Sequence, residues 1–400
     1  MNAQSRNAVD ALADSVDVTL IESLTCRLIE APSVNPGGVE QPAVDVLAAA
    51  CRESGFAVDL HEVSPQRPNL LATAGTGTGP GMLFLGHTDV VPPGPGWTGD
   101  PFTARRDGDR LIGRGTCDMK GGLAAIVAAM AALARAAEFG ITLSGPVTLA
   151  ATVDEEELNS GSRHLVRQPL PSFAGCIVAE PTSLQVVRAC RGASYIDIAI
   201  TGRAAHSGRP SDGVSAIAAA AAVIGLIDDD QAALARDSDP LLGHGTWNVG
   251  LIRGGQAIAV VAPDCYLGVD RRLMPDESVE GVAARLRTAI EAAGIGDGGA
   301  RVEVRPTMEL PGFTTPHDHP LVQAVARAVT DSGGQTSIGG WTAACDGGYV
   351  SRDLHVPTVV MGAGDINTQA HQPDESVSLT ELAIAARAYV RAAVDLLSVD

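Results

Sequence analysis

A histidine and an aspartate two positions apart stand at the end of an apolar run early in the chain. Residues 83–89 read Leu-Phe-Leu-Gly-His-Thr-Asp, which places His87 and Asp89 where a buried strand would end. Side chains alternate between the two faces of a strand, so these two point the same way. A carboxylate in that position can accept the second ring N–H of a histidine that binds a metal ion. The pair suggests a metal ligand and its supporting carboxylate, although two residues alone are weak evidence.

Further residues of metal-binding types follow, each at the end of its own apolar segment. They are Asp118, Glu155, Glu156, Glu180 and His371. With His87 they provide enough carboxylate and imidazole ligands for two metal ions. Two divalent cations that share a water lower its pKa from about 15.7 towards neutrality, so that it becomes hydroxide and can attack an amide carbonyl.

Two of these carboxylates are adjacent, and their tasks must differ. Glu155 and Glu156 follow one strand and cannot both face the same metal, so one can ligate while the other moves a proton. By themselves, the four acidic residues 154–157 are more typical of a solvated turn. Asp118 likewise precedes an alanine-rich helix and could simply cap it. The metal interpretation therefore depends on the whole set.

The pattern of apolar segments predicts an α/β sheet. Short apolar runs typical of strands occur at residues 69–74, 82–85, 147–153 and 176–179. Helical spacing of apolar residues is found at residues 18–28, 42–54 and 121–137. Such sheets are covered by helices on both faces and bind ligands beyond the carboxyl ends of their strands. His87, residues 154–156 and Glu180 all lie at such ends.

A second pattern interrupts the first. Predicted strands and helices of a compact α+β insert lie at residues 194–201, 215–227, 245–252, 260–269, 279–293 and 302–304. The first pattern resumes with a helix at 321–332, a strand at 357–361 and a helix at 380–397. We therefore expect one domain made of residues 1–191 and 304–400, interrupted by a smaller domain of residues 192–303 whose sheet has an exposed edge.

The composition of the chain argues against several classes of function and location. The chain of 400 residues is long for one core, and its 45% of hydrophobic residues can fill two. A formal net charge of -19 argues against non-specific binding to nucleic acid or to an anionic membrane. The longest uncharged stretches, residues 121–134 and 213–227, are short for a spanning helix, which needs about 20 apolar residues. The polar N-terminus lacks signal-peptide features, and the seven scattered cysteines include no Cys-x-x-Cys pair, so we expect reduced thiols in a cytoplasmic protein.

Five segments together resemble the signature blocks of the M20 metallopeptidase family. They are residues 86–92 (Gly-His-Thr-Asp-Val-Val-Pro), 113–122 (Gly-Arg-Gly-Thr-Cys-Asp-Met-Lys-Gly-Gly), 154–156 (Asp-Glu-Glu), 180–182 (Glu-Pro-Thr) and 369–375 (Gln-Ala-His-Gln-Pro-Asp-Glu). They occur in the family's order and are most similar to the acetylornithine deacetylase and succinyl-diaminopimelate desuccinylase group. The resemblance implies a zinc-peptidase-like α/β catalytic domain, with a mixed sheet flanked by helices, interrupted by a smaller α+β lid and dimerisation domain.

The resemblance also implies a role for each predicted site residue. The expected ligands are His87 and Glu180 for one zinc ion and Glu156 and His371 for the other, with Asp118 bridging both. Asp89 would orient the His87 ring, and Glu155 would be the general base. A cis peptide bond is expected after Asp118. Cobalt or manganese would also suit these ligands.

Residues of the insert gain their roles only from the resemblance. His206 matches a histidine that reaches the active site of a partner subunit and stabilises an oxyanion, which would require a homodimer. Arg272 matches an arginine that clamps a substrate carboxylate. The neighbouring Arg271 replaces a residue that is usually apolar, and which of the two points inward stays open. Ala259 stands where many relatives carry an asparagine, so one substrate hydrogen bond would be missing.

These expectations converge on one reaction class. We expect a metal-dependent amidohydrolase that removes a small acyl group from the α-nitrogen of an amino acid. An exopeptidase or dipeptidase is the alternative, because the same site cleaves any amide with a free carboxylate nearby. A non-catalytic relative that binds amino-acid derivatives is opposed by Glu155, since a binding protein needs no general base. Asp346, in a predicted substrate loop, either pairs with a substrate ammonium or holds the loop.

Overall fold

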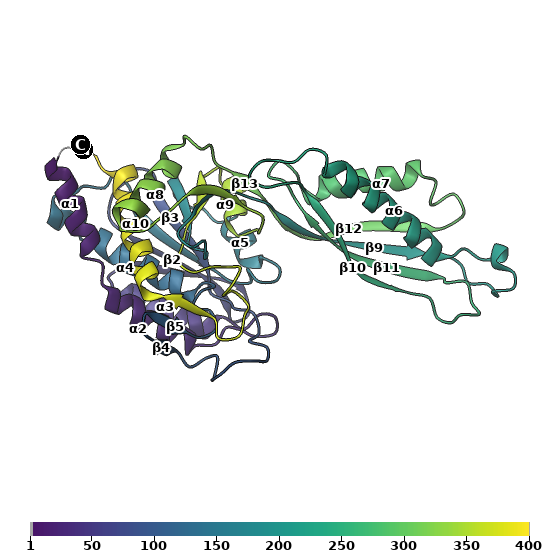
Figure 1. Ribbon diagram of the computed structural model, residues 1–400, viewed down its shortest axis with the longest axis horizontal. Coiled ribbons are helices and arrows are strands. Elements are labelled where there is room, and N and C mark those ends of the chain that lie inside the picture. Colours follow the sequence, from purple (N-terminus) through teal and green to yellow (C-terminus); the bar gives the residue numbers. More distant parts are fainter. Residues whose placement is uncertain (1–2, 400) are drawn as a thin grey trace. The chain divides into compact units, whose positions relative to one another are not determined.

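The computed structural model describes residues 3–399 and divides into two compact units. Unit 1 contains the described residues up to Arg188, residues 314–339 and those from Cys345 onward. Unit 2 contains residues 189–313 and 340–344. Both units combine strands and helices (Figure 1), and each has its own core of buried apolar side chains.

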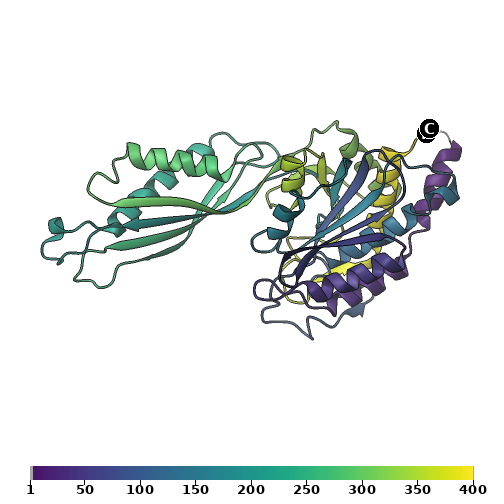
Figure 2. The same cartoon turned by 180° about the vertical axis from the view of Figure 1, so that it is seen from behind.

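A nine-stranded mixed sheet forms the centre of unit 1, in the order β1-β2-β6-β3-β7-β15-β8-β13, with β14 paired to β8. Its strands span Ala57–Ser64 (β1), Arg67–Ala74 (β2), Gly81–His87 (β3), Val147–Thr152 (β6), Phe173–Val178 (β7), Val186–Cys190 (β8), Phe313–Thr314 (β13), Ile338–Trp341 (β14) and Thr358–Val360 (β15). β3 runs parallel to β6 and β7, whereas β2 is antiparallel to β1 and β6. The predicted mixed α/β fold, with helices flanking the sheet, is confirmed (Figures 1 and 2).

The central strands are buried, which explains their continuous apolar sequences. All seven residues of β3 and all six of β6 are buried. A strand in the middle of such a sheet is covered on both sides, so it lacks the alternation of a half-exposed strand. In the register of the sheet, His87 of β3 pairs with Thr152 of β6, and Leu85 of β3 pairs with Val178 of β7. The carboxyl ends of these three parallel strands therefore lie side by side.

Helices α4 and α10 pack against β3, with α2 beside α4 and α8 beside α10. The helices of unit 1 span Ala3–Asp14 (α1), Val18–Ile29 (α2), Gln41–Glu53 (α3), Lys120–Leu133 (α4), Ser160–Leu165 (α5), Pro320–Asp331 (α8), Gly347–Asp353 (α9) and Leu379–Leu397 (α10). Every residue of α4 except Ala131 is buried. A helix that is apolar all round is buried on all sides, and this one fixes the loop that precedes it.

Several bounds differ from the sequence-based expectation. The helices predicted at 18–28 and 380–397 differ by one residue from α2 and α10. The helix predicted at 121–137 instead ends at Leu133 and is followed by a 3-10 turn, Ala136–Phe139, closed by Gly140 at a φ of 73°. Helix α1 was not expected from its polar composition, yet Val9, Leu12 and Ala13 on one side of it are buried. A small sheet, in the order β16-β5-β4, was also not expected; its strands span Ser376–Ser378, Arg110–Ile112 and Arg105–Asp107.

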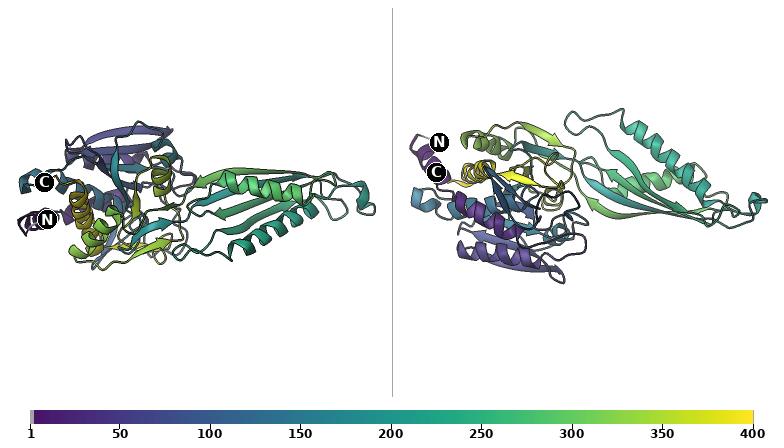
Figure 3. Two further views of the ribbon diagram at one scale, coloured as in Figure 1. Left: turned by 90° about the horizontal axis from the view of Figure 1, so that it is seen from above. Right: turned by 60° about the horizontal axis from the view of Figure 1, so that its bottom comes forward.

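Unit 2 is an antiparallel four-stranded sheet, in the order β10-β11-β9-β12, with two long helices packed on it (Figure 3). The elements span Ala193–Thr201 (β9), Thr246–Gly254 (β10), Asp264–Arg272 (β11), Arg301–Leu310 (β12), Ala216–Leu234 (α6) and Val279–Ala292 (α7). Residues of β9 alternate, so that Ile196 and Ile198 are buried while Tyr195 is exposed. β11 begins four residues later than predicted, because Pro263 has no N–H to give to a sheet.

Candidate active site

The predicted ligands of unit 1 meet at the carboxyl ends of β3, β6 and β7. His87 is the last residue of β3, Glu180 follows β7 by two residues, and Glu156 lies in the loop after β6. Asp118 comes from the loop before α4, where the Asp118–Met119 peptide bond is cis, as expected. His371 comes from the loop before β16. Each strand end thus supplies one ligand, and two loops complete the set.

The first ligand group is buried and consists of His87, Asp118 and Glu180. The Nε2 atom of His87 lies 3.1 Å from Oδ1 of Asp118 and 3.5 Å from Oε1 of Glu180. Ligands held at about 2.1 Å from one tetrahedral zinc ion lie about 3.4 Å from one another. The separations therefore match a common metal ion.

The second group consists of Asp118, Glu156 and His371. The Nε2 atom of His371 lies 3.1 Å from Oε2 of Glu156 and 3.4 Å from Oδ2 of Asp118. Asp118 thus presents one carboxylate oxygen to each group, as a bridging ligand does. Its side chain is 8% exposed, whereas that of His371 is 51% exposed, so the second group is the more open of the two.

The electrostatics of the cluster fit two cations. Burial raises the pKa of Glu156 and of Glu180, and the charge of Asp118 raises both further. One oxygen of Glu156, Oε1, is buried without a hydrogen-bond partner among the described residues. Hydrogen bonds to Asp118 and Glu156 raise the pKa of His371 to about 10. Carboxylates crowded in this way need positive charge, which metal ions would provide.

Glu155 is placed beside the ligands and belongs to neither group. Burial is the main cause that raises the pKa of Glu155 well above its usual range, and the charges of Glu180 and Asp346 add to it. Its backbone N–H donates to Oδ1 of Asp89 at 3.2 Å, and that of Glu156 donates to Oδ2 of Asp89 at 3.1 Å. The residue as a whole is partly exposed to solvent.

Asp89 supports two parts of the site at once. The Nδ1 atom of His87 is closest to the backbone oxygen of Asp89, at 2.9 Å, and lies 3.5 Å from the carboxylate. The main chain of Asp89 therefore orients the His87 ring more directly than the carboxylate does. The carboxylate accepts hydrogen bonds from the peptide N–H groups of Glu155 and Glu156 and from the side chain of Asn35, a task that was not expected from the sequence.

Other supporting residues were also missed. Glu375 is fully buried and accepts hydrogen bonds from the backbone N–H groups of Gly115, Cys117 and Asp118 at 3.0, 2.8 and 2.9 Å. The guanidinium of Arg114 donates to it at 2.6 Å. Glu375 stands inside a recognised sequence block, but nothing local marks it as the anchor of a loop more than 250 positions away.

Asp346 holds a loop in the structure. Thr152 donates to one of its oxygens at 2.6 Å, and the side-chain amide of Asn159 donates to the other at 3.2 Å. Only 2% of Asp346 is exposed. Both carboxylate oxygens are thus engaged with the segment that carries Glu155, which favours the loop-holding interpretation over a substrate contact.

Unit 2 carries the remaining predicted residues. His206 is exposed, and the backbone N–H of Gly208 donates to its Nδ1 atom at 3.0 Å, which leaves Nε2 as the protonated nitrogen of the neutral ring. Arg271 is fully buried and paired with Glu277, whereas Arg272 has 38% of its side chain exposed and its Nε donates to Oδ1 of Asp270 at 3.1 Å. Ala259 is exposed.

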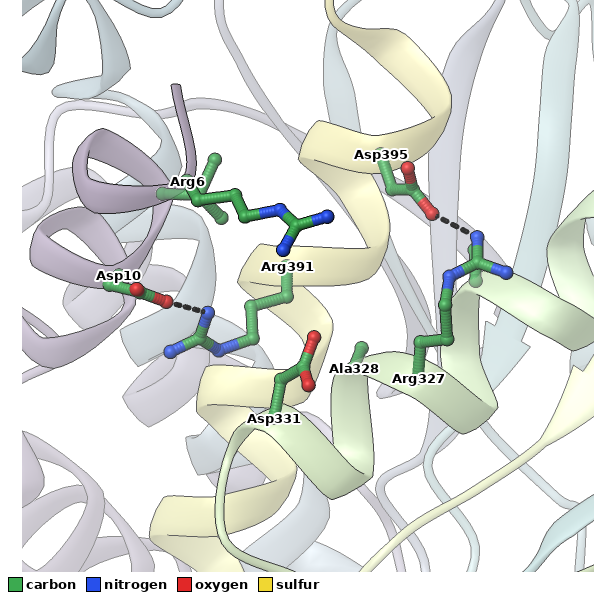
Figure 4. Close-up of a pocket in the computed structure, with 9 residues that line it drawn as sticks. Arg6, Asp10, Arg327, Ala328, Asp331, Arg391 and Asp395 are labelled. Atoms are coloured by element: carbon green, nitrogen blue, oxygen red, sulfur yellow. Dashed lines mark hydrogen bonds and ion pairs between the residues drawn. The ribbon is translucent and has the colours of Figure 1, made fainter. Parts of the chain in front are cut away.

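A charged groove of about 640 Å³ lies elsewhere in unit 1, among α1, α8 and α10 (Figure 4). Two ion pairs cross it, Arg391 with Asp10 and Arg327 with Asp395, both at 2.5 Å. None of the predicted site residues lines it. Among residues 3–399, we find no helix that combines the length and apolar character needed to cross a membrane.

Comparison with known proteins identifies the family. The family described as peptidase family M20/M25/M40 matches residues 83–395. The chain is similar to acetylornithine deacetylase of Klebsiella pneumoniae (strain 342), with 36% identity over 340 residues that cover 83% of this chain and 85% of the relative. Its fold is similar to that of aminopeptidase PepT from Bacillus cereus ATCC 10987, with a TM-score of 0.77, 22% identity and coverage of 96% and 99%. It is also similar to the YXEP protein of Bacillus subtilis, a dinuclear metal binding peptidase from the M20 family, with a TM-score of 0.71, 17% identity and coverage of 95% and 98%. The chain therefore belongs to the M20 metallopeptidase family and is a hydrolase.

Proposed function

We propose that this hydrolase cleaves the amide bond of an N-acyl amino acid, as an acetylornithine deacetylase-like deacylase with two bound metal ions. The observation that carries the proposal is the pair of ligand groups that share Asp118, with Glu155 beside them. Similarity to an acetylornithine deacetylase over 83% of the chain favours a deacylase over a peptidase. Zinc is the expected metal, and cobalt or manganese would suit the same donors.

Glu155 is the proposed general base. When bound, the two cations would acidify a water and polarise the substrate carbonyl. Glu155 would take the proton from the water and deliver it to the leaving nitrogen, because it is the carboxylate that neither ligand group uses. Burial raises the pKa of Glu155, and nearby cations would act in the opposite direction, so its environment allows it both to accept and to donate a proton.

Unit 1 is the proposed catalytic domain and unit 2 the proposed lid and dimerisation domain. The exposed Nε2–H of His206 suits a donor to an oxyanion, and Arg272 suits a substrate carboxylate. We propose that His206 acts in the active site of a second copy of the chain. Co-expression of a Glu155→Gln chain with a His206→Ala chain should then recover activity in mixed dimers, and no recovery would contradict this role.

The edge strand β10 is the proposed dimer contact. Leu251 and Ile252 on this strand are 48% and 58% exposed, and Ile217 of the neighbouring α6 is 44% exposed. Exposed apolar edges tend to pair with another chain. Leu251→Asp should therefore shift the protein towards monomer in sedimentation velocity. Val399→Asp, at a comparably exposed position of unit 1 that lies outside its strands, is the matched control and should leave the oligomeric state unchanged.

An M20 exopeptidase or dipeptidase is the second candidate function, because the fold is also that of M20 peptidases. A non-catalytic relative that binds amino-acid derivatives is third, and the retained Glu155 opposes it. A cytoplasmic location is proposed because the seven cysteines, all within the described residues, form no disulfide bond, which suits a reducing compartment.

The test is hydrolysis of N-acetyl, N-succinyl and N-formyl amino acids beside simple dipeptides, with zinc or cobalt added and with a chelator control. Chelator-sensitive release of an amino acid from an acylated substrate is expected. Cleavage of dipeptides alone would move the assignment to peptidase. If protein that binds two metal ions hydrolyses none of these substrates, the result would contradict the proposed reaction.

A further inference from the structure

A buried polar network lies next to the segment that carries Glu155 and Glu156. Arg67, the first residue of β2, donates to both oxygens of Glu40 at 2.6 and 2.5 Å. Its Nη2 atom also donates to Oδ1 of Asp154 at 3.2 Å. The side chains of Glu40 and Asp154 are 1% and 3% exposed, and that of Arg67 is 20% exposed. One guanidinium thus serves two carboxylates that have almost no contact with solvent.

Asn35 joins this network to Asp89. Its Nδ2 atom donates to Oδ2 of Asp89 and to Oδ1 of Asp154, both at 2.9 Å. The Oδ1 atom of Asn35 is buried and has no hydrogen-bond partner within the described part of the chain. The side-chain amide of Asn35 keeps this orientation, although its oxygen is unsatisfied, because both of the hydrogen bonds that it donates go to carboxylates.

Asp154 needs such support because of its backbone. Its φ is 66°, in the left-handed region, which is unfavourable for a residue other than glycine. Such a conformation persists only when its surroundings fix it. Here Asn35 and Arg67 hold one carboxylate oxygen, and the backbone N–H of Ser160 donates to the other at 3.2 Å. The turn at Asp154 directs the next two residues, Glu155 and Glu156.

We propose that Arg67 and Asn35 are positioning residues, which fix the segment 154–156 and thereby set the general base Glu155 and the metal ligand Glu156. The role for Glu155 rests on the proposed function. The role for Glu156 concerns metal binding and can be tested without a substrate. Neither Arg67 nor Asn35 belongs to the ligand groups, so each acts through Asp154 or Asp89.

The asymmetry of the ligand groups makes the proposal testable. Glu156 belongs to one group only, whereas His87 and Glu180 form the other with Asp118. Arg67→Met removes the guanidinium and keeps an unbranched apolar side chain. It should weaken the binding of one of the two Zn²⁺ ions by about 10–100-fold, the usual effect of losing a supporting residue, and leave the other within about threefold. Competition with a chromophoric chelator measures both dissociation constants.

The same variant should lower kcat by about tenfold or more while KM changes by less than about threefold, because the base is displaced and the substrate contacts are not. Asn35→Leu should act in the same direction. Arg67→Lys, which keeps the charge and loses the paired geometry, should give an intermediate zinc affinity. Arg391→Met is the control: it removes the ion pair of another arginine, 11% exposed, with the exposed Asp10 in the groove of Figure 4, and should leave both zinc affinities unchanged.

Two results would overturn the proposal. One is a melting temperature that falls in Arg67→Met while both zinc affinities and kcat stay as in the native protein, which is the mark of a merely structural pair. The other is an equal weakening of both ions. If Arg67→Met does not fold, the zinc affinities of Arg67→Lys and Asn35→Leu decide by the same criteria. If the native protein hydrolyses nothing in the panel, the proposed function fails, and the zinc titration still decides the role of Arg67.

Discussion

Replacement of Glu375 should destabilise unit 1 more than any exposed charge replacement. This side chain has no solvent exposure and is bound by the guanidinium of Arg114, itself 1% exposed, and by three backbone N–H groups of the Asp118 loop. Alanine at this position would leave a buried positive charge and three donors without an acceptor. Glutamine would keep the shape and one acceptor oxygen but would turn an NH₂ group towards donors.

The expected loss in the free energy of unfolding follows from these partners of Glu375. Burial is the main cause that raises the pKa of Glu375, although the N–H of Gly115 and the charge of Arg114 act to lower it. The desolvation of Glu375 therefore offsets much of the stability that its contacts contribute. Truncation of the side chain lowers the free energy of unfolding mainly because buried donors are left without an acceptor. Losing one partner of a buried ion pair costs about 3–5 kcal/mol, and water that enters the space can satisfy part of the N–H groups. We expect about 5 kcal/mol for Glu375→Ala and about 2–3 kcal/mol for Glu375→Gln.

Urea unfolding at neutral pH measures these changes in the free energy of unfolding. Glu22→Gln is the control, because Glu22 pairs with Arg106 at the surface, where the side chains are 30% and 56% exposed. Such a pair contributes about 0.5 kcal/mol. Glu375→Gln should also weaken metal binding by about 10–100-fold, since the Asp118 loop loses its anchor. A loss below about 1 kcal/mol for Glu375→Ala, or unchanged metal affinity, would refute this account.

Three further predictions concern the metal centre. Glu155→Gln should keep two metal ions by elemental analysis but lower kcat by about 10²–10⁴-fold, and native turnover would remove Glu155 as the base. Hydrogen bonds to Asp118 and Glu156 raise the pKa of His371 to about 10, so its ring must lose a proton to bind metal. The affinity for one ion should therefore rise about tenfold per pH unit between about pH 6 and 8; an affinity independent of pH would contradict this. Chelation should lower the melting temperature, by linkage, yet leave the far-ultraviolet circular dichroism unchanged; loss of that signal would show that the metals hold the fold.

The fold was predictable where apolar periodicity is strong. The buried strands β3 and β6 read as continuous apolar runs, and α10 shows clear helical spacing, so these elements were found. Helix α1 was missed because its few apolar residues are diluted by polar ones, and only its packing in unit 1 reveals that Leu12 is fully buried. The strands of the small sheet have three residues each, too few for a period to appear.

In the candidate site, the ligands were predictable from the sequence and the supporting residues were not. Ligands such as His87 and Glu180 were found because strand ends mark them, and the structure brings the predicted ligands together in two groups. The supporting residues could not be found, because their partners are distant in sequence. Arg67 and Asp154 are 87 positions apart, and Glu375 and Asp118 are 257 apart. A polar residue whose partner lies that far away carries no local pattern that distinguishes it from a surface charge.

Strands and loops hold the predicted ligands in different ways. Strands fix His87 through the buried sheet, but the segments that carry Asp118 and Glu156 are loops, which apolar packing alone does not order. Buried carboxylates hold them instead: Glu375 binds the first loop and Asp89 the second. Because these bonds are made within the protein, the proposed ligands are positioned by contacts that need no metal ion. If the chain binds metal as proposed, its affinity would depend on polar residues that never touch the ions, and it would be lost without the loss of a single ligand.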